Sequence, residues 1–437
     1  MKKLLLILLC LPMIGFGQEW EKTFGFYQSN QFGSSVQQTA DGGYIITGYT
    51  ELWQEYEVIL YKIDANGIME WDRAYDNVAG TEMGLSVQQT TDGGYIITGY
   101  LDGNSGMSAS FLIKTDGLGI EQWNTIWQIS GVNKAYSGQQ TTDGGYIFAG
   151  HTDSLGSGNT TAFLNKTDGN GIDQWYKTFG GSNWELSSAK SVQQTNDGGY
   201  VITGTKTSLA NGDEDVFIIK INANGNTQWR NAFGGTNDDE GHSVQQTTDG
   251  GYIITGFTKS FGNLDRDVFL IKTDGLGIEQ WSRTLGGTAG DYGYSVQQTT
   301  DGGYIIAGQT GSFGSGDGDV YLIKTDGNGI GQWYKTFGGT DTNEYATSVQ
   351  QTTDGGYVIT GREYFFDVDE AEYITNVILI KTNGNGIPIS TFNIPINPNR
   401  KLQKTVDMLG KETKPKPNTP LIEIYDDGTV EKRIVIE

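Results

Sequence analysis

The sequence predicts an all-β protein: a seven-bladed β-propeller of four-stranded antiparallel blades, followed by a short C-terminal β tail. Three observations support this prediction. A unit of 51 to 54 residues occurs seven times, each unit divides into four short runs separated by glycine-rich turns, and an extra copy of the fourth run stands near the N-terminus. A period near fifty residues is typical of propellers, solenoids and tandem arrays.

The repeat is marked by the tetrapeptide Asp-Gly-Gly-Tyr. It begins at Asp41, Asp92, Asp143, Asp197, Asp249, Asp301 and Asp354. The fifth unit shows the four runs most clearly, as Ser243 to Thr247, Tyr252 to Thr258, Asp267 to Thr273 and Gln280 to Leu285. Turn sequences with Asp and Gly separate these runs, and none has the 3.6-residue apolar period of a helix.

The third run favours a propeller over other repeat architectures. Val268 to Ile271 is apolar at every position, whereas a strand with one solvent-exposed face should alternate. Middle strands of a propeller blade are covered on both faces by neighbouring blades. A β-helix would need many shorter rungs, and separate domains of fifty residues would bury too little surface to be stable.

The number of blades follows from ring closure. A Trp in the fourth run recurs in units one to six, but Pro388-Ile389-Ser390 stands at this place in the seventh unit. The extra copy, Glu19 to Gly25, precedes the first unit. We therefore expect this N-terminal segment to become the outer strand of blade seven, which removes the free sheet edges where the ring closes.

Both ends of the chain differ from the repeats. Residues 1–17 contain Lys2 and Lys3, an apolar run from Leu4 to Leu11, and a Gly-Phe-Gly end, the order of a signal peptide. Cys10 is the single cysteine, so the mature chain would have no disulfide and no thiolate site. We predict a propeller over residues 18–395, and a linker and tail over 396–437, where six of the seven prolines lie at or beyond Pro388.

The net charge of −23 and the composition exclude several classes of function. Nucleic acids and anionic membrane surfaces are poor partners for such an acidic chain. No transmembrane segment is expected in the mature chain, because the apolar run in residues 1–17 is the only one of its kind and is short for a hydrocarbon core of about 30 Å.

The repeat VQQTxDGGYIITGxT…DVxLIKTDxxGxxQWxKTFGG resembles those of exported bacterial propeller proteins, a resemblance that implies architecture but no activity. The segments Val406–Thr413 and Ile424–Glu437 resemble the C-terminal sorting signals of the Bacteroidetes type IX secretion system. That resemblance implies passage through the periplasm to the outer-membrane surface or the medium, with the secretion machinery as partner. The alternative is a small β-hairpin packed on the propeller.

Catalytic signatures are absent from the sequence. It contains no Gly-x-Ser-x-Gly, no Gly-Lys-Ser/Thr phosphate loop and no His-Glu-x-x-His. His151 and His242 have no partner at ligand spacing, and we expect both to be solvated loop residues. Repeated residues are best explained as scaffold, because all blades share them. They are the Asp of Asp-Gly-Gly, the Lys of the third run and the Trp of the fourth run. We expect this Trp to pack on the next blade rather than to stack on sugars.

No cofactor is expected, with calcium as an open alternative. Asp-x-Asp pairs precede the third run in four units: Asp213/Asp215, Asp265/Asp267, Asp317/Asp319 and Asp367/Asp369. Calcium takes six to eight oxygen ligands, so two carboxylates and loop carbonyls could begin a site. None of these segments is an EF-hand loop, and a role at the start of the strand is favoured.

The positions that break the repeat indicate where binding occurs. The second-to-third loops and the interblade loops vary, and in an up-and-down blade they emerge on one face, here called the variable face. The strongest departure is Arg362 to Tyr373, which we expect to be a loop beside blade one. It covers the closure of the ring or forms a binding site. The predicted binding residues are Trp53, Tyr56, Tyr364, Phe365, Phe366, Asp367 and Asp369.

These observations favour a secreted or cell-surface binding module for a glycan, a peptide or a surface partner. Two alternatives remain. One is a carbohydrate-active hydrolase or lyase that uses loop carboxylates, and the other is a purely structural surface protein.

Overall fold

The computed structural model describes residues 20–25, 29–52, 55–76, 80–103, 107–128, 131–153, 160–180, 186–207, 213–263, 265–367, 372–387, 402–406, 420–425 and 430–434. The chain divides into two compact units, Met1–Pro388 and Ile389–Glu437. The predicted signal peptide and the predicted boundary near residue 395 lie outside the described residues.

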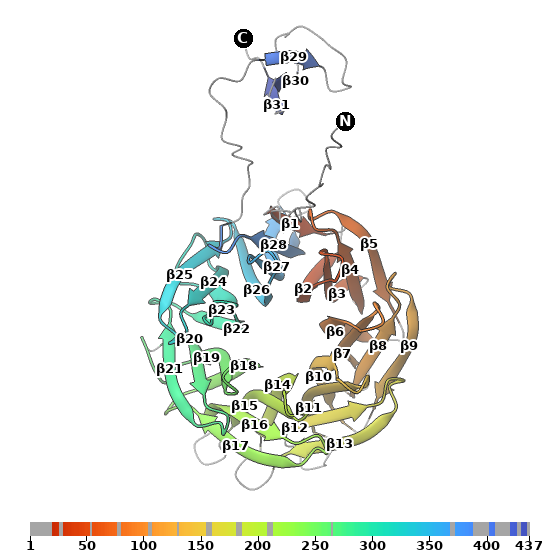
Figure 1. The fold of residues 1–437 in the computed structure, drawn as a ribbon, viewed down its shortest axis with the longest axis vertical. Helices are drawn as coiled ribbons and strands as arrows, with labels where there is room; N and C mark the ends of the chain where they lie inside the picture. Colours follow the sequence, from red (N-terminus) through yellow and green to blue (C-terminus); the bar gives the residue numbers. More distant parts are fainter. Residues whose placement is uncertain are drawn as a thin grey trace, which may run out of the picture. The chain divides into compact units, whose positions relative to one another are not determined.

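Seven four-stranded antiparallel sheets form a ring (Figure 1). Blade 1 comprises β2 (Asn30–Gln38), β3 (Tyr44–Leu52), β4 (Glu55–Ile63) and β5 (Met69–Tyr75). Blade 2 comprises β6 (Thr81–Gln89), β7 (Tyr95–Asp102), β8 (Ser108–Thr115) and β9 (Glu121–Trp127). Blade 3 comprises β10 (Asn133–Gln140), β11 (Tyr146–Thr152), β12 (Thr161–Thr167) and β13 (Asp173–Phe179). Blade 4 comprises β14 (Leu186–Gln194), β15 (Tyr200–Thr207), β16 (Glu214–Ile221) and β17 (Thr227–Phe233).

The other three blades follow the same order. Blade 5 comprises β18 (Asp239–Gln246), β19 (Tyr252–Thr258), β20 (Asp267–Thr273) and β21 (Glu279–Leu285). Blade 6 comprises β22 (Asp291–Gln298), β23 (Tyr304–Thr310), β24 (Asp319–Thr325) and β25 (Gly331–Phe337). Blade 7 comprises β26 (Thr342–Gln351), β27 (Tyr357–Asp367), β28 (Glu372–Thr382) and β1 (Trp20–Phe24). The second unit contains a separate sheet of β29 (Leu402–Val406), β30 (Pro420–Tyr425) and β31 (Val430–Ile434).

The predicted fold class is therefore confirmed, including the seven blades and the short C-terminal β tail. The described residues contain no helix, and so none that could cross a membrane. The apolar third run behaves as expected, since all seven residues of β20 are buried between blades.

Two details of the sequence prediction are wrong. The inner strand of blade 5 begins at Asp239, four residues before the expected Ser243. Arg362 to Tyr373 is not a loop throughout, because β27 and β28 extend as a long hairpin with Phe366 opposite Tyr373. In both places the residues depart from the repeat, so a sequence pattern built on the repeat could not show that strand pairing continues through them.

The N-terminal strand closes the ring as predicted. It pairs antiparallel with β28, with Trp20 opposite Lys381 and Phe24 opposite Val377. Trp20 is buried and meets Tyr44 of blade 1 edge to face, with ring centroids 5.7 Å apart. A Cβ on Gly67, which has a φ of 80°, would lie 2.7 Å from the Trp20 ring, so this turn requires glycine.

The same Trp–Tyr contact occurs at all seven interfaces between blades. The other six pairs are Trp71–Tyr95, Trp123–Tyr146, Trp175–Tyr200, Trp229–Tyr252, Trp281–Tyr304 and Trp333–Tyr357. Their ring centroids are 5.6 to 6.0 Å apart. This explains the repeated Trp and Tyr as packing between blades, as predicted, rather than as binding platforms.

The repeated glutamines form two closed rings of hydrogen bonds. The Gln37 side-chain carbonyl accepts a hydrogen bond from the Gln89 backbone N–H of the next blade (2.5 Å), and the equivalent bond forms at all seven interfaces. In the opposite direction, the Gln89 side-chain carbonyl accepts from the Ala40 N–H (2.8 Å), again at all seven interfaces. Both rings continue through Gln350 and Gln38, so they cross from blade 7 to blade 1.

Each blade also has an ion pair between the buried Lys of its third strand and the more exposed Asp of its Asp-Gly-Gly turn, at 2.8 to 3.0 Å. In blade 5, Asp249 also accepts hydrogen bonds from the Thr247 hydroxyl and the Gly251 N–H. Partial burial would raise the pKa of Asp249, but these bonds and Lys272 outweigh it and lower the pKa to about 2. The lysines are scaffold, as predicted.

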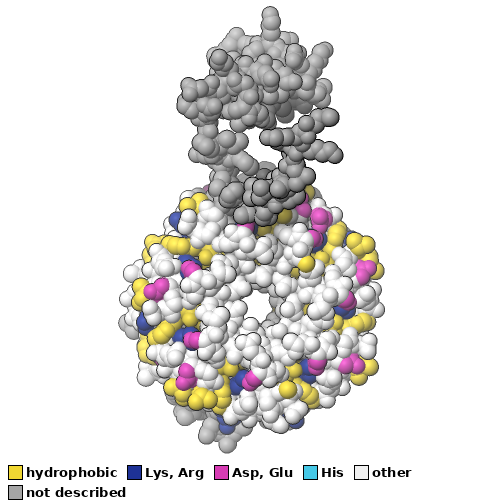
Figure 2. All heavy atoms as spheres, in the orientation of Figure 1, with side chains coloured by type: hydrophobic (Ala, Val, Ile, Leu, Met, Phe, Trp, Pro, Cys, Tyr) yellow, Lys and Arg dark blue, Asp and Glu magenta, His cyan; other side chains and the backbone are white. Residues whose placement is uncertain are grey.

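The inner strands surround a central channel, visible as an opening in Figure 2. On the face shown in that view the rim of the opening is white, and acidic, basic and hydrophobic side chains recur further out, toward the edge of the ring. The first-to-second and third-to-fourth turns emerge together on one face, here called the uniform face, and the variable loops emerge on the other.

We expect the closure of the ring to depend on Trp20. Replacing Trp20 with Ala should cost about 3–5 kcal/mol, since it leaves a cavity against Tyr44. Deleting residues 18–25 should lower the melting temperature further, because it exposes the edge of β28. Lys22→Ala, an exposed change on the same strand, is the matched control. Calorimetric melting temperatures that are equal in the deletion variant, Trp20→Ala and Lys22→Ala would contradict this role.

Candidate functional site

The candidate site lies at the end of the channel where the inner strands stop repeating. Every inner strand contains a β-bulge just before its repeated Ser, at which one residue is left unpaired. These seven residues are Ser34, Leu85, Tyr136, Lys190, His242, Tyr294 and Thr347. A bulge changes the direction in which a side chain points. The strand is thus uniform after the bulge and different in every blade before it.

A second set of variable residues lies two positions before each bulge and pairs with the second strand. The pairs are Phe32–Tyr49, Met83–Tyr100, Lys134–His151, Ser188–Thr205, Glu240–Phe257, Tyr292–Gln309 and Tyr345–Arg362. Together with the bulge residues they form the channel mouth, the name used below for these three positions in all blades. It is rich in aromatic rings and carries charges of both signs.

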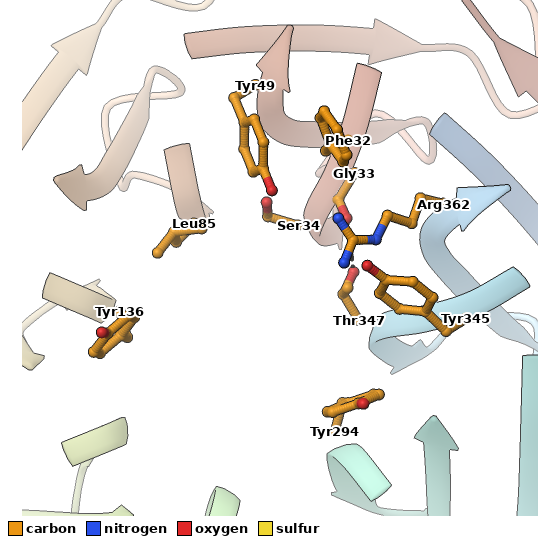
Figure 3. Close-up of a pocket in the computed structure, with 10 residues that line it drawn as sticks. All are labelled: Phe32, Gly33, Ser34, Tyr49, Leu85, Tyr136, Tyr294, Tyr345, Thr347 and Arg362. Atoms are coloured by element: carbon orange, nitrogen blue, oxygen red, sulfur yellow. Dashed lines mark hydrogen bonds between the residues drawn. The ribbon is translucent and has the colours of Figure 1, made fainter. Parts of the chain in front are cut away.

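A cavity of about 260 Å³ lies in the channel mouth and is lined by residues from five blades. Phe32 and Tyr49 line one side, Tyr345 and Arg362 stand beside them, and Tyr294 lies further round the ring (Figure 3). A second cavity of about 510 Å³ shares Phe32, Tyr345 and Arg362 and continues along the hairpin to Tyr364 and Tyr373. Arg362 therefore stands where the two cavities meet.

Arg362 is held by aromatic rings. Its guanidinium carbon is 4.0 Å from the centroid of the Tyr345 ring and 5.2 Å from that of Phe32. Burial lowers the pKa of Arg362, and the nearby phenols of Tyr49, Tyr294 and Tyr56 partly oppose this effect. A guanidinium whose face stacks on a ring keeps its N–H donors at the edge, available to an acceptor in the cavity.

Other cations at the channel mouth also lie over rings. Lys134 is 4.3 Å from the Tyr100 ring centroid and is paired with Asp102 at 2.8 Å. Lys190 is 4.2 Å from the Tyr136 ring centroid, and its pKa is lowered by burial. The channel mouth thus combines aromatic surfaces with positive charges in a chain that is acidic overall.

Both histidines lie at the channel mouth, so the expectation of solvated loop residues is wrong. His151 is in β11, where its Nδ1 lies 3.1 Å from the Tyr136 hydroxyl. Burial, and then Lys190 and Lys134, lower the pKa of His151 to about 4, so it is neutral at pH 7. His242 is in β18 and stacks on Tyr294, with centroids 5.2 Å apart. Their spacing in the sequence gave no signal, because Tyr136 reaches His151 across the strand pair of blade 3 and Tyr294 reaches His242 from the next blade.

A carboxylate pair lies between blades 4 and 5. Burial raises the pKa of Glu214 to about 7, and the charge of Glu240 and its hydrogen bond add to this effect. Burial would also raise the pKa of Glu240, but the hydrogen bond and charge of His242 outweigh it and lower that pKa. Two carboxyl groups whose pKa values are driven apart can act as an acid and a base.

The predicted binding residues are only partly brought together. Tyr56 lies beside the first cavity, with its ring 5.4 Å from Tyr49. Tyr364 lines the second cavity and stacks on Tyr373, with centroids 4.8 Å apart.

The other predicted residues contribute less or fall outside the described part. Phe366 is exposed and contacts Tyr373. Phe365, between Tyr364 and Phe366 in the sequence, is half-buried. Asp367 ends β27, and its side chain, like Trp53 and Asp369, lies outside the described residues. Sequence reasoning missed the inner-strand residues, although a column-by-column comparison of the units before Ser-Val-Gln-Gln could have shown their variation.

The described side chains include no group of three or more His, Cys, Asp or Glu residues placed to hold a metal ion. The two members of each Asp-x-Asp pair differ in burial in blades 5 and 6. Asp265 and Asp317 are exposed, whereas Asp267 and Asp319 are buried at the start of the third strand.

Comparisons with known proteins show the fold alone. No family model and no curated protein matches the chain. A catalytically inactive virginiamycin B lyase from Staphylococcus aureus, solved with quinupristin, matches at a TM-score of 0.50 with 10% identity, over 83% of this chain and 99% of that one. An ulvan lyase of a new polysaccharide lyase family matches at 0.49 with 10% identity, over 84% and 97%. Sqt1 from Chaetomium thermophilum matches at 0.45 with 10% identity, over 93% and 97%.

Proposed function

We propose that the protein is an exported binding module that holds a glycan or a peptide at the channel mouth between blades 7 and 1. The observation that carries this proposal is the position of Arg362, which borders two adjoining cavities and stacks on Tyr345. Ligand sites commonly combine apolar walls with a few placed polar groups. Here the walls are aromatic, and the guanidinium edge supplies hydrogen-bond donors.

The same side chains could bind a glycan or a peptide. Aromatic faces such as Phe32 and Tyr364 can stack on sugar rings or on side chains, and a guanidinium binds hydroxyl, carbonyl or carboxylate oxygens. The non-repeating residues are concentrated here, whereas the repeated residues already have roles in packing or hydrogen bonding. Function on a repeat scaffold usually lies where the repeats differ.

We expect Arg362→Gln and Tyr345→Ala to weaken binding at least about tenfold, the loss typical of a central contact residue. Glycan and peptide arrays probed with the chain would identify the ligand, and titration calorimetry would measure the loss. Tyr334→Ala is the matched control, since Tyr334 is an exposed aromatic residue of the outer strand β25. Equal affinity in all variants would contradict the proposed site, and no binding to either array would favour the structural alternative.

A second candidate function is a hydrolase or lyase acting on carbohydrate, which is favoured by Glu214 and Glu240. If Glu214 is the acid, the rate should fall as the pH rises above about 7, because Glu214 then loses its proton. Glu214→Gln should abolish turnover and leave ligand binding in place. Turnover of array-positive glycans would be followed by reducing ends and by absorbance of unsaturated products. Activity that is unchanged in Glu214→Gln would contradict this role, and binding without any turnover would favour the binding module.

We further propose that the chain passes through the periplasm to the outer-membrane surface or the medium. The support is the order of residues 1–17 and the similarity of residues 406–437 to type IX sorting signals. Removal of residues 400–437 in the native host should leave the protein in the periplasm, because the signal peptide still acts. Immunoblots of periplasm, membrane and medium would measure this. Normal amounts of the truncated protein outside the cell would contradict the sorting role.

A further inference from the structure

Three neighbouring interfaces each bring two carboxylates to the same loop glycine, outside the channel mouth. One carboxylate comes from the start of a third strand and the other from the start of the next blade's inner strand. The three sets are Asp215 and Asp239 beside Gly234, Asp267 and Asp291 beside Gly286, and Asp319 and Glu344 beside Gly338.

The two carboxylates of each set face the same point. A Cβ on Gly338 would lie 2.0 Å from Asp319 Oδ1 and 2.5 Å from Glu344 Oε2. A Cβ on Gly286 would lie 2.3 Å from Asp267 Oδ1 and 2.6 Å from Asp291 Oδ2. All four acidic residues are buried, with exposed fractions of 0 to 5%. Like charges this close and this well buried repel each other unless a cation or a proton lies nearby.

These carboxylates have only part of their hydrogen-bonding capacity filled. Asp291 Oδ2 accepts bonds from the Gly287 N–H and the Ser312 hydroxyl, but Asp291 Oδ1 is buried without a partner. Glu344 Oε1 accepts from the Gly339 N–H, but Glu344 Oε2, the oxygen that faces Asp319, is likewise buried without a partner. An unpartnered buried carboxylate oxygen is costly, and so it points to a missing ligand.

Among the described residues, none of these four carboxylates forms an ion pair with a lysine or an arginine. Burial raises the pKa of Asp267, and the charges that add to this are those of Asp291 and Asp265. Burial raises the pKa of Glu344 to about 7 despite hydrogen bonds that lower it, and the charges of Glu363 and Asp319 raise it further.

The interface between blades 4 and 5 differs in one respect. There Lys206 of β15 lies opposite Asp215 in the strand register, with its ammonium 2.8 Å from the carboxylate. The residues in the same register in blades 5 and 6 are Thr258, opposite Asp267, and Thr310, opposite Asp319. In the part of the chain that the structure describes, an ion pair therefore offsets one carboxylate pair, and no ion pair offsets the other two.

We propose that Asp267 with Asp291, and Asp319 with Glu344, each bind a calcium ion between adjacent blades. In the interface between blades 4 and 5, the ammonium group of Lys206 takes the place of this ion. Calcium accepts carboxylate, carbonyl and water oxygens in flexible geometry. Each pair supplies two side chains, so backbone carbonyls and water complete the shell. Such sites are weak, with dissociation constants of about 0.1–1 mM, which suits extracellular calcium.

The ion would join the third strand of one blade to the inner strand of the next. This differs from the Asp-x-Asp interpretation, because the partner of Asp267 is Asp291 in the next blade and not the exposed Asp265. The proposal is independent of the ligand at the channel mouth.

The test compares calcium binding by two proteins, the wild type and the double variant Asp291→Asn/Glu344→Gln. Both lack residues 1–17 and are first treated with a chelator. We expect two calcium ions per chain in equilibrium dialysis, none in the double variant, and a rise in melting temperature of about 2 °C or more in 10 mM calcium for the wild type alone. Any divalent ion stabilises an acidic chain by screening its charges. The melting temperature of the double variant in calcium, and that of the wild type in 10 mM magnesium, measure this general effect.

Two matched variants use the lysine-bearing interface. Asp215→Asn should leave both calcium ions in place, whereas Lys206→Thr, which copies Thr258 and Thr310, should add a third. Equal calcium binding by the wild type and the double variant would overturn the proposal. A wild type that binds no calcium would overturn it as well.

Discussion

The structure depends on the glutamine hydrogen bonds that run from each blade to the next. The Gln37 side chain accepts a hydrogen bond from the backbone of the following blade, and the Gln89 side chain accepts one from the turn of the preceding blade. No blade can satisfy these groups alone, because donor and acceptor belong to different blades. The two rings are complete only when blade 7 meets blade 1, so the hydrogen bonding of every inner strand is tied to closure by β1. Pairing of the N-terminal strand β1 with β28 therefore also holds the inner strands that line the channel in place.

The rings also divide each inner strand into two parts with different roles. After the bulge, the repeated Ser and the two repeated Gln are occupied by bonds between blades and cannot vary without loss, whereas the Val between them is replaced by Gly138 in blade 3. Before the bulge, side chains such as Glu240 and Tyr345 make no part of the rings, so the seven blades can differ there. The bulge separates a scaffold end of the channel from an end at which binding groups can be placed.

Charge is distributed according to the same division. Seven of the chain's lysines are buried in the blade scaffold, each paired with the Asp of a turn. The channel mouth uses its cations differently, holding Arg362 and Lys190 over aromatic rings. The acidic interfaces of blades 4 to 7 lie apart from both, and among the described residues the ion pair of Lys206 offsets one of them. Local pairing, more than the net charge of −23, decides what each region can bind.

The sequence by itself determined the repeat, the four strands of each blade, the number of blades and the closure by Trp20. These follow from local turn chemistry and from a pattern copied seven times, so each copy supports the others. Only the tertiary structure decided the channel mouth and the carboxylate pairs. Tyr345 and Phe32 are 313 residues apart, and they meet at Arg362 because the ring closes. Asp267 and Asp291 become a pair because adjacent blades pack, and no single unit of the repeat contains such a contact.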